Sequence, residues 1–315
     1  MNITLALDCP PNTNHIGFYV ALVSGWYAEA GLQVRITSPE RDNYVLSPAR
    51  KVAAGLATFG LCPSESIISF HTLPARPRLM AIAALLQHDT SAIVTVAGRG
   101  RDRPAQLDGC VYASYGSRFE AAIVAQMIRN DGGQGTFARV HPPKFDIWET
   151  LLRGEADAAW VFVPGKGQAA LQGGVRLNTF LLDDYQIPYG YSPVITAHPH
   201  TLRRQPELVQ TFLAISGRGF TYAAQHPHAA ADLFYCAASN PHHTSRELLL
   251  LSLNQLQSDF LHPASGQWGR MEPQRWEVFL TWLITTGILS DLPTPLALKA
   301  HHLFSNRYLD PSLPA

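Results

Sequence analysis

Several features that mark common classes of protein are missing from this sequence. No apolar run approaches the roughly 20 residues that a membrane-spanning helix needs, so we expect no membrane span. Basic and acidic residues are balanced at 24 each, which leaves no basic surface for nucleic acid. The 4 cysteines are scattered without a Cys-x-x-Cys pair, which argues against a structural zinc site or a disulfide framework. Nucleotide-binding glycine loops, Gly-x-Ser-x-Gly and His-Glu-x-x-His are also absent, so no metal or common catalytic motif is predicted.

The N-terminus shows no secretory signal pattern. Met1 leads within two residues into alternating apolar residues, without a charged start, an apolar core and a small-residue cleavage site. We therefore expect a cytoplasmic protein, or a periplasmic one if a leader has been removed.

Alternating strand and helix patterns predict an α/β fold. Ile3, Leu5 and Leu7 alternate in a short run, which predicts a buried strand. Apolar residues then recur at helical spacing from Asn14 through Trp26, and Gly31 ends that predicted helix. Because such pairs repeat along the chain, we expect mostly parallel sheets with helices on both faces.

The chain is predicted to form two lobes. A polar connection around Gly98 separates a first strand–helix series from a second, and residues 188–199 are expected to cross back. Lobe 1 would contain residues 1–95 and 195–315, with residues 96–194 inserted as lobe 2. Lobes joined by two crossovers usually close on a ligand in the cleft between them, with the crossovers as the hinge.

The first candidate site is the turn 8–15, DCPPNTNH, which follows the first predicted strand. Ligands bind at the carboxyl ends of strands in open α/β sheets, and side chains such as Asn12 and His15 can bond a small polar molecule there. Tyr19 lies one helical turn further on. The alternative is that an asparagine only caps the helix while His15 faces solvent. Cys9 and Cys62 each follow a predicted strand and could reach one cleft, or be ordinary reduced thiols.

A second candidate is the turn from Tyr115 to Arg118. Gly116 permits a tight turn, and Ser117 is expected to cap a helix whose first turn holds Arg118 and Glu120. Free N–H groups, a hydroxyl and a guanidinium suit a phosphate or carboxylate, although a simple capping box explains the pattern nearly as well.

Two further groups complete the candidate site. Glu65 lies in the first turn of a helix predicted to be capped by Ser64, and its carboxylate could accept hydrogen bonds from an amino group of a ligand. Trp160 and Tyr189 stand with other aromatic residues near the predicted return crossing. Aromatic rings near a hinge either sandwich a planar ligand or pack the hinge itself.

The sequence resembles the thiamine-pyrimidine precursor family. The N-terminal stretch LALDCPPNTNHIGFYVALVSGWYAEAGLQV resembles the opening of these proteins, and IAALL, GEADAAWVF and IPYGYSPV match further segments. The family contains bacterial substrate-binding proteins for aminopyrimidines and fungal enzymes that make hydroxymethylpyrimidine phosphate. The resemblance therefore implies the two-lobed type 2 periplasmic-binding-protein fold.

Two positions depart from the family pattern. Cys9 stands where the family commonly has a tryptophan, and Cys62 stands where the fungal enzymes have the lysine that binds pyridoxal phosphate. The cysteine-rich iron-binding run of those enzymes is absent. We therefore expect no cofactor, and we leave open whether the chain is an enzyme of the hydroxymethylpyrimidine phosphate synthase type.

The sequence as a whole predicts a protein that binds a small planar nitrogenous ligand, a thiamine pyrimidine precursor of the hydroxymethylpyrimidine or formylaminopyrimidine type. The alternatives are the synthase-like enzyme, or a transporter-associated binding protein or intracellular sensor for another small molecule. An ABC permease is a candidate partner. The expected ligand-binding residues are Asp8, Cys9, Asn12, Asn14, His15, Tyr19, Glu65, Tyr115, Gly116, Ser117, Arg118, Trp160 and Tyr189.

Overall fold

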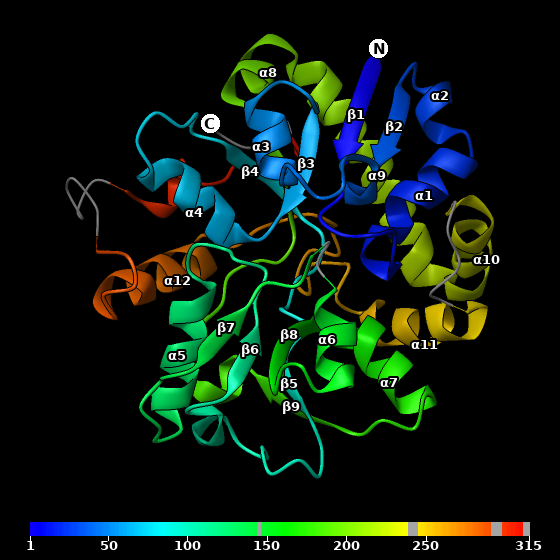
Figure 1. Ribbon diagram of the computed structural model, residues 1–315. Coiled ribbons are helices and arrows are strands. Elements are labelled where there is room, and N and C mark those ends of the chain that lie inside the picture. The colour runs from blue at the N-terminus through cyan, green and yellow to red at the C-terminus, as the bar shows by residue number, and fades with distance from the viewer. Residues whose placement is uncertain (144–145, 239–244, 291–297, 311–315) are drawn as a thin grey trace. The chain divides into compact units, whose positions relative to one another are not determined.

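The computed structural model describes residues 1–143, 146–238, 245–290 and 298–310. It divides into two compact units, each built around its own sheet (Figure 1). Unit 1 contains Met1–Asp89, Gly190–Glu277 and Pro293–Ala315, and unit 2 contains Thr90–Tyr189 and Val278–Leu292.

The sheet of unit 1 has the strand order β2-β1-β3-β10-β4. The strands are β1 (Asn2–Ala6), β2 (Gln33–Thr37), β3 (Phe59–Cys62), β4 (Met80–Ala84) and β10 (Val194–Ala197). β1 pairs in parallel with β2 and β3, whereas β10 is antiparallel to both of its neighbours. The carboxyl ends of β1 and β3 therefore lie at the same edge, where the segments after Ala6 and Cys62 leave the sheet.

Helices pack on this sheet through aromatic and small residues. The helices of unit 1 are α1 (Ile16–Val23), α2 (Trp26–Glu29), α3 (Pro48–Ala53), α4 (Ser64–Thr72), α8 (Pro199–Arg204), α9 (Pro206–Gln225), α10 (Pro227–Ala237) and α11 (Arg246–Leu256). The rings of Phe59 on β3 and Phe212 on α9 stack at 4.6 Å. Gly17 and Gly219 lie where α1 and α9 cross, and a Cβ on Gly219 would overlap the backbone oxygen of Gly17. This close crossing fixes the helix that follows the polar turn.

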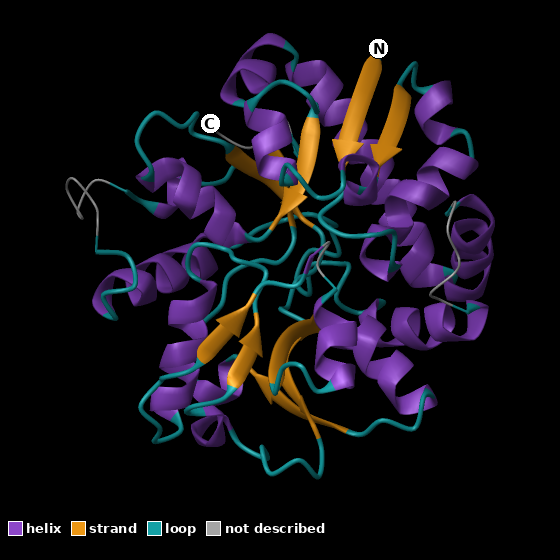
Figure 2. Ribbon diagram, viewed as in Figure 1, coloured by secondary structure: helices purple, strands orange, loops and turns teal. Residues whose placement is uncertain are grey.

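The sheet of unit 2 has the strand order β7-β6-β8-β5-β9. Figure 2 shows the strands in orange and the helices in purple. Its elements are β5 (Ser91–Val96), β6 (Val111–Ala113), α5 (Glu120–Asn130), β7 (Ala138–Val140), α6 (Ile147–Arg153), β8 (Ala158–Phe162), α7 (Gln168–Gln172) and β9 (Leu177–Leu181). β6 is parallel to β7 and β8, and β5 is antiparallel to β8 and β9. Trp148 and Leu151 of α6 pack with Val161 of β8 in its core. One further helix, α12 (Pro273–Thr285), starts in unit 1 and ends in unit 2.

The predicted α/β class is confirmed, since each unit has a sheet with helices. The expectation of mostly parallel sheets is wrong, because each sheet has two parallel and two antiparallel strand pairs. The expected single helix from Asn14 through Trp26 is wrong in detail. It consists of a 3-10 turn at Thr13–His15, then α1 and α2, which are separated at Gly25 because this glycine takes a left-handed φ of 77°. Gly31 has a φ of 74° just beyond α2, as expected of a helix stop. No helix in the described ranges has the length and apolar character needed to cross a membrane.

Candidate functional site

The turn that follows β1 is organised by Asn12. Its Oδ1 accepts a hydrogen bond from the N–H of Asn14 at 2.8 Å, and its Nδ2 donates to the sulfur of Cys9 at 3.0 Å. The N–H of Asn12 in turn donates to Nδ1 of His15 at 3.2 Å, which completes a capping box. The alternative interpretation of Asn12 as a cap is therefore correct, and this side chain shapes the turn.

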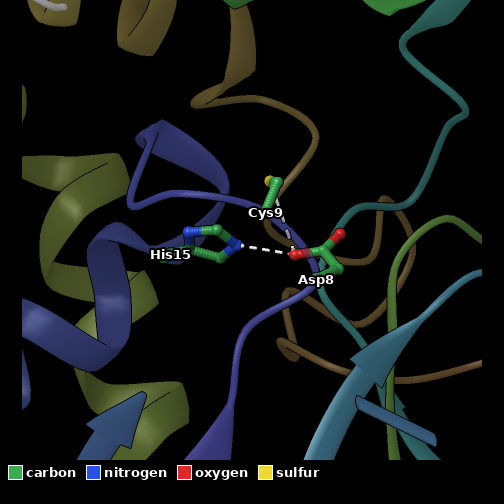
Figure 3. Close-up of side chains that lie close together, drawn as sticks. All are labelled: Asp8, Cys9 and His15. Atoms are coloured by element: carbon green, nitrogen blue, oxygen red, sulfur yellow. Dashed lines mark hydrogen bonds and ion pairs between the residues drawn. The ribbon is translucent and has the colours of Figure 1, made fainter. Parts of the chain in front are cut away.

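His15 connects the turn back to the end of the strand. Its ring is fully buried, contrary to the alternative that placed it in solvent. Nε2 lies 2.9 Å from Oδ1 of Asp8, and the thiol of Cys9 lies 3.6 Å from the same oxygen (Figure 3). The other carboxylate oxygen of Asp8 points away from His15, and the side chain is 27% exposed. A buried imidazole thus orients a carboxylate that still presents one oxygen outward.

Asp8, Cys9 and His15 also bring three potential metal ligands within 4.8 Å of one another. The hydrogen bonds argue against a metal ion here. Because Nδ1 of His15 accepts the N–H of Asn12, the proton of a neutral ring is on Nε2, which donates it to Asp8. A metal ion bound to Nε2 would leave the ring proton on Nδ1. That proton would then face the N–H of Asn12, which is also a donor. The three residues fit a hydrogen-bonded group better than a metal centre.

Asn14 and Tyr19 lie deeper in the same region. Asn14 is 6% exposed, and its Oδ1 has no hydrogen-bond partner among the described residues. A buried acceptor without a partner is costly, so a ligand or water is the expected partner. The ring of Tyr19 packs edge-on against Phe234 at 5.0 Å, and burial raises the pKa of its phenol to about 12. Tyr19 therefore stays a neutral hydrogen-bonding group near neutral pH.

The end of β3 adds a second set of polar groups. Glu65, in the first turn of α4, is 4% exposed, and Ser64 is fully buried with no hydrogen-bond partner for its hydroxyl among the described residues. Burial raises the pKa of the Cys62 thiol, and the carboxylates of Asp8 and Glu65 raise it further. Because β1 and β3 are parallel neighbours, Asp8 after β1 and Cys62 and Glu65 at the end of β3 lie at the same carboxyl edge of the sheet. The predicted cap is wrong, because Ser64 is the first residue of α4 and Pro63 precedes it at the cap position.

Arg275, which was not among the residues predicted from the sequence, holds a segment next to α4. Its guanidinium donates to the carbonyl of Gly190 at 2.9 Å and to that of Gln87, and it lies 4.4 Å from the centre of the Tyr191 ring. The carbonyl of Tyr191 accepts the N–H of Ser64 at 2.8 Å. This arginine thus supports the segment against which α4 begins. Its position in the first turn of a helix gave no signal of that role.

In unit 2, the loop after β6 is held by Glu120. This buried carboxylate accepts hydrogen bonds from Tyr112 at 2.8 Å, from Ser114 at 3.0 Å, and from the N–H groups of Tyr115 and Ser117 at 3.0 and 3.1 Å. Four donors satisfy the charge without a buried cation. The Glu120 carboxylate therefore accepts the hydrogen bonds that these donors would otherwise offer to an external anion.

The expected cap at Ser117 is therefore wrong. α5 begins at Glu120, with Phe119 before it, because the loop winds around the Glu120 carboxylate. The N–H of Gly116 donates to the hydroxyl of Ser114 at 3.0 Å, so this donor is also used within the loop. Arg118 lies over the ring of Phe119 at 4.8 Å. We assign no phosphate site to these N–H groups; Tyr115, which is 43% exposed, presents a ring at the surface.

The aromatic candidates of unit 2 separate into two groups. Trp160 and Tyr189 lie 5.3 Å apart, and the indole N–H of Trp160 donates to Ser91 at 2.7 Å. Tyr185, an aromatic residue shortly before the return crossing, instead packs edge-on against Phe180. The structure thus brings together Trp160 and Tyr189, and in unit 1 it brings together Asp8, Cys9, Asn12, Asn14 and His15.

Two α/β sheets, each with polar groups at the carboxyl ends of its parallel strands, define the class of periplasmic-binding-protein folds. Comparison with solved structures supports this class. The alkanesulfonate-binding protein SsuA from Xanthomonas axonopodis pv. citri is similar with a TM-score of 0.69 at 10% identity, over 96% of this chain and 98% of that one. The periplasmic aliphatic sulphonate binding protein SsuA from Escherichia coli gives a TM-score of 0.64 at 14% identity, over 93% and 89%. The predicted fold is confirmed.

The family model described as NMT1/THI5 like matches residues 12–230, and the chain belongs to this family. This confirms the predicted family. A curated relative, the formylaminopyrimidine-binding protein of Halalkalibacterium halodurans, is 22% identical over 285 residues, which cover 89% of this chain and 84% of the relative. The cytoplasmic location stays a prediction, and one of the two structural neighbours above is described as periplasmic.

Proposed function

We propose that this protein binds a small planar nitrogenous molecule, a thiamine pyrimidine precursor of the formylaminopyrimidine type, through the polar turn of unit 1. The observation that carries this proposal is the Asp8 carboxylate, one oxygen of which bonds His15 at 2.9 Å while the other points away from His15, on a side chain that is 27% exposed. The name of the bacterial relative and the family membership support the same ligand class.

The chemistry of the turn suits a ligand with amino groups. Asp8 and the buried Oδ1 of Asn14 are acceptors, and Glu65 adds a further carboxylate at the same edge. An aminopyrimidine offers an exocyclic amino donor to such acceptors and ring nitrogens to a donor such as the neutral phenol of Tyr19. Rejection of ligands that lack the amino group follows, because the acceptors would then be left unpaired.

Unit 2 is assigned the apolar part of the recognition. We propose that units 1 and 2 are the two lobes predicted as residues 1–95 with 195–315 and residues 96–194, with the boundaries shifted so that β5 and Val278–Leu292 belong to the second lobe. Trp160, Tyr189 and Tyr115 then offer ring faces to a planar molecule. Gly116, Ser117 and Arg118 form the loop that carries Tyr115, whose backbone donors are already used.

Cys62 favours a binding role over a synthase-like enzyme. A thiol cannot form the Schiff base that a lysine forms with pyridoxal phosphate, and burial keeps this thiol protonated. A binding protein of this fold would deliver its ligand to an ABC permease, in line with the import components among its structural neighbours.

Isothermal titration calorimetry with formylaminopyrimidine tests the proposal. We expect binding to the unmodified protein, at least about tenfold weaker binding to the analogue without the ring amino group, and a similar loss in the Asp8→Asn variant. The control is Glu207→Gln, an exposed acidic residue of the same unit, which should bind within about twofold of the unmodified protein. Equal affinity for both ligands, or no effect of Asp8→Asn, would exclude this role for Asp8.

A further inference from the structure

A cavity lies in unit 1, over one face of the β1–β2 pair. Thr4 of β1 is paired with Arg35 of β2, whereas the flanking Ile3 and Leu5 are buried at 2% and 0% exposure. Because side chains alternate along a strand, Thr4 and Arg35 project to the face opposite the buried pair. This face is polar, as expected for one that faces water.

The cavity has a volume of about 450 Å³. Its floor is the β1–β2 face, and its walls come from the segment after β2 and from α3 with the turn that follows it. The residues that determine its chemistry are Arg35, Arg41, Asp42, Val45, Lys51 and Leu56. The volume falls within the range of small-molecule sites, roughly 300 to 1,000 Å³.

The charge in the cavity is mainly positive. Lys51 pairs with Asp42 at 3.0 Å, a contact that ties α3 to the wall segment. Arg35 donates to the hydroxyl of Thr4 at 3.3 Å, and neither Arg35 nor Arg41 has a carboxylate partner among the described residues. The guanidinium groups of Arg35 and Arg41 are thus available to an anion, whereas the charge of Lys51 is neutralised by Asp42.

The rim of the cavity is apolar on two sides. Val45 and Leu56 are 72% and 61% exposed, although both are large hydrophobic side chains. They belong to two different wall segments, one before α3 and one after it. Apolar side chains beside guanidinium groups suit a molecule with an anionic end and an apolar body.

We propose that this cavity binds a small organic anion, with its carboxylate or phosphate on Arg35 and Arg41 and its apolar part against Val45 and Leu56. The site differs from the proposed pyrimidine site: Arg35 lies in the middle of β2 and the cavity does not include the turn after β1. The two sites also favour different classes of ligand, because the turn offers hydrogen-bond acceptors whereas the cavity offers cationic donors.

Calorimetric titration with phenyl phosphate tests this proposal, because this probe combines a phosphate with an apolar ring. We expect binding that weakens as salt is raised, and weaker binding of inorganic phosphate and of phenol, which each lack one half of the probe. The Arg35→Gln/Arg41→Gln variant should lose at least about tenfold in affinity, and Leu56→Ser should lose affinity for phenyl phosphate more than for inorganic phosphate.

The matched control is Arg50→Gln, an exposed arginine of α3 that does not line the cavity. It should change the affinity by less than about twofold. Absence of binding at about 10 mM phenyl phosphate, or equal losses in Arg50→Gln and in the double variant, would overturn the proposal. Circular dichroism of each variant establishes that it is folded, and all substituted side chains are exposed.

Discussion

Arg275 gives the most informative test of how unit 1 is held together. Its guanidinium bonds the carbonyls of Gln87 and Gly190, which lie close to the points where the chain leaves and re-enters unit 1. The same group lies over the Tyr191 ring at 4.4 Å. Arg275 itself is two residues before Glu277, where α12 leaves the unit. The side chain of Arg275 thus links three places at which the chain leaves or re-enters unit 1.

The magnitude follows from these contacts. A hydrogen bond from a charged group contributes up to about 1.5 to 3 kcal/mol, and a cation over an aromatic ring about 0.5 to 1 kcal/mol. Since Arg275 is partly exposed, water replaces some of this, and we expect Arg275→Ala to lower the free energy of unfolding by about 2 to 3 kcal/mol. Arg275→Lys should lose about 1 to 2 kcal/mol, because an ammonium cannot reproduce the planar fork.

Urea unfolding followed by circular dichroism measures both variants. Arg50→Ala is the control, because this exposed arginine of α3 should change the free energy of unfolding by less than about 0.5 kcal/mol. If Arg275→Ala unfolds like the control, the bonds to the two carbonyls contribute nothing. If Arg275→Lys has the same free energy of unfolding as the unmodified protein, a positive charge alone is sufficient. The planar shape of the guanidinium then contributes nothing.

Four further predictions concern buried groups. At about pH 8, iodoacetamide should alkylate Cys62 at least about tenfold more slowly than the exposed Cys236, because burial raises the pKa of the Cys62 thiol; equal rates by mass spectrometry would contradict this. Above about pH 8.5 the unfolded thiol ionises while the folded one does not, so stability should fall with pH, and less so in Cys62→Ala. Glu120→Gln should cost about 2 to 3 kcal/mol in thermal unfolding, because an amide replaces an acceptor of four hydrogen bonds. Gly219→Ala should cost about 1 to 3 kcal/mol, as its Cβ overlaps a backbone oxygen of α1, whereas Gly173→Ala at the end of α7 should be nearly neutral.

Strands and turns were predictable here because their signals are local. The alternation of Ile3 and Leu5 predicted β1. The polar turn was predictable as a group for the same reason, since its residues follow one strand within a short stretch. The interruption at Gly25 was missed because a left-handed glycine within a helical pattern leaves the apolar spacing unchanged.

The direction of each side chain was less predictable. The ring of His15 is held in the turn by the hydrogen bond that its Nδ1 accepts from the N–H of Asn12. The sequence does not reveal which of the two ring nitrogens accepts this bond. Glu120 was expected in a capping box, but its carboxylate takes hydroxyl groups from Tyr112 and Ser114 as well. Such competition between nearby acceptors depends on distances of a few tenths of an ångström. Arg275 was missed for a related reason, because its partners Gln87 and Gly190 are far from it in sequence.

These differences also separate the expected roles of the two units. The loop of unit 2 satisfies its own donors through Glu120, so its polar groups have little left to offer a ligand. The turn of unit 1 instead keeps a buried acceptor on Asn14 and an outward oxygen on Asp8. Unpaired acceptors impose a cost that only a donor-bearing ligand or water removes, whereas ring faces such as Trp160 accept many planar molecules. We therefore propose that discrimination between ligands arises at the turn of unit 1.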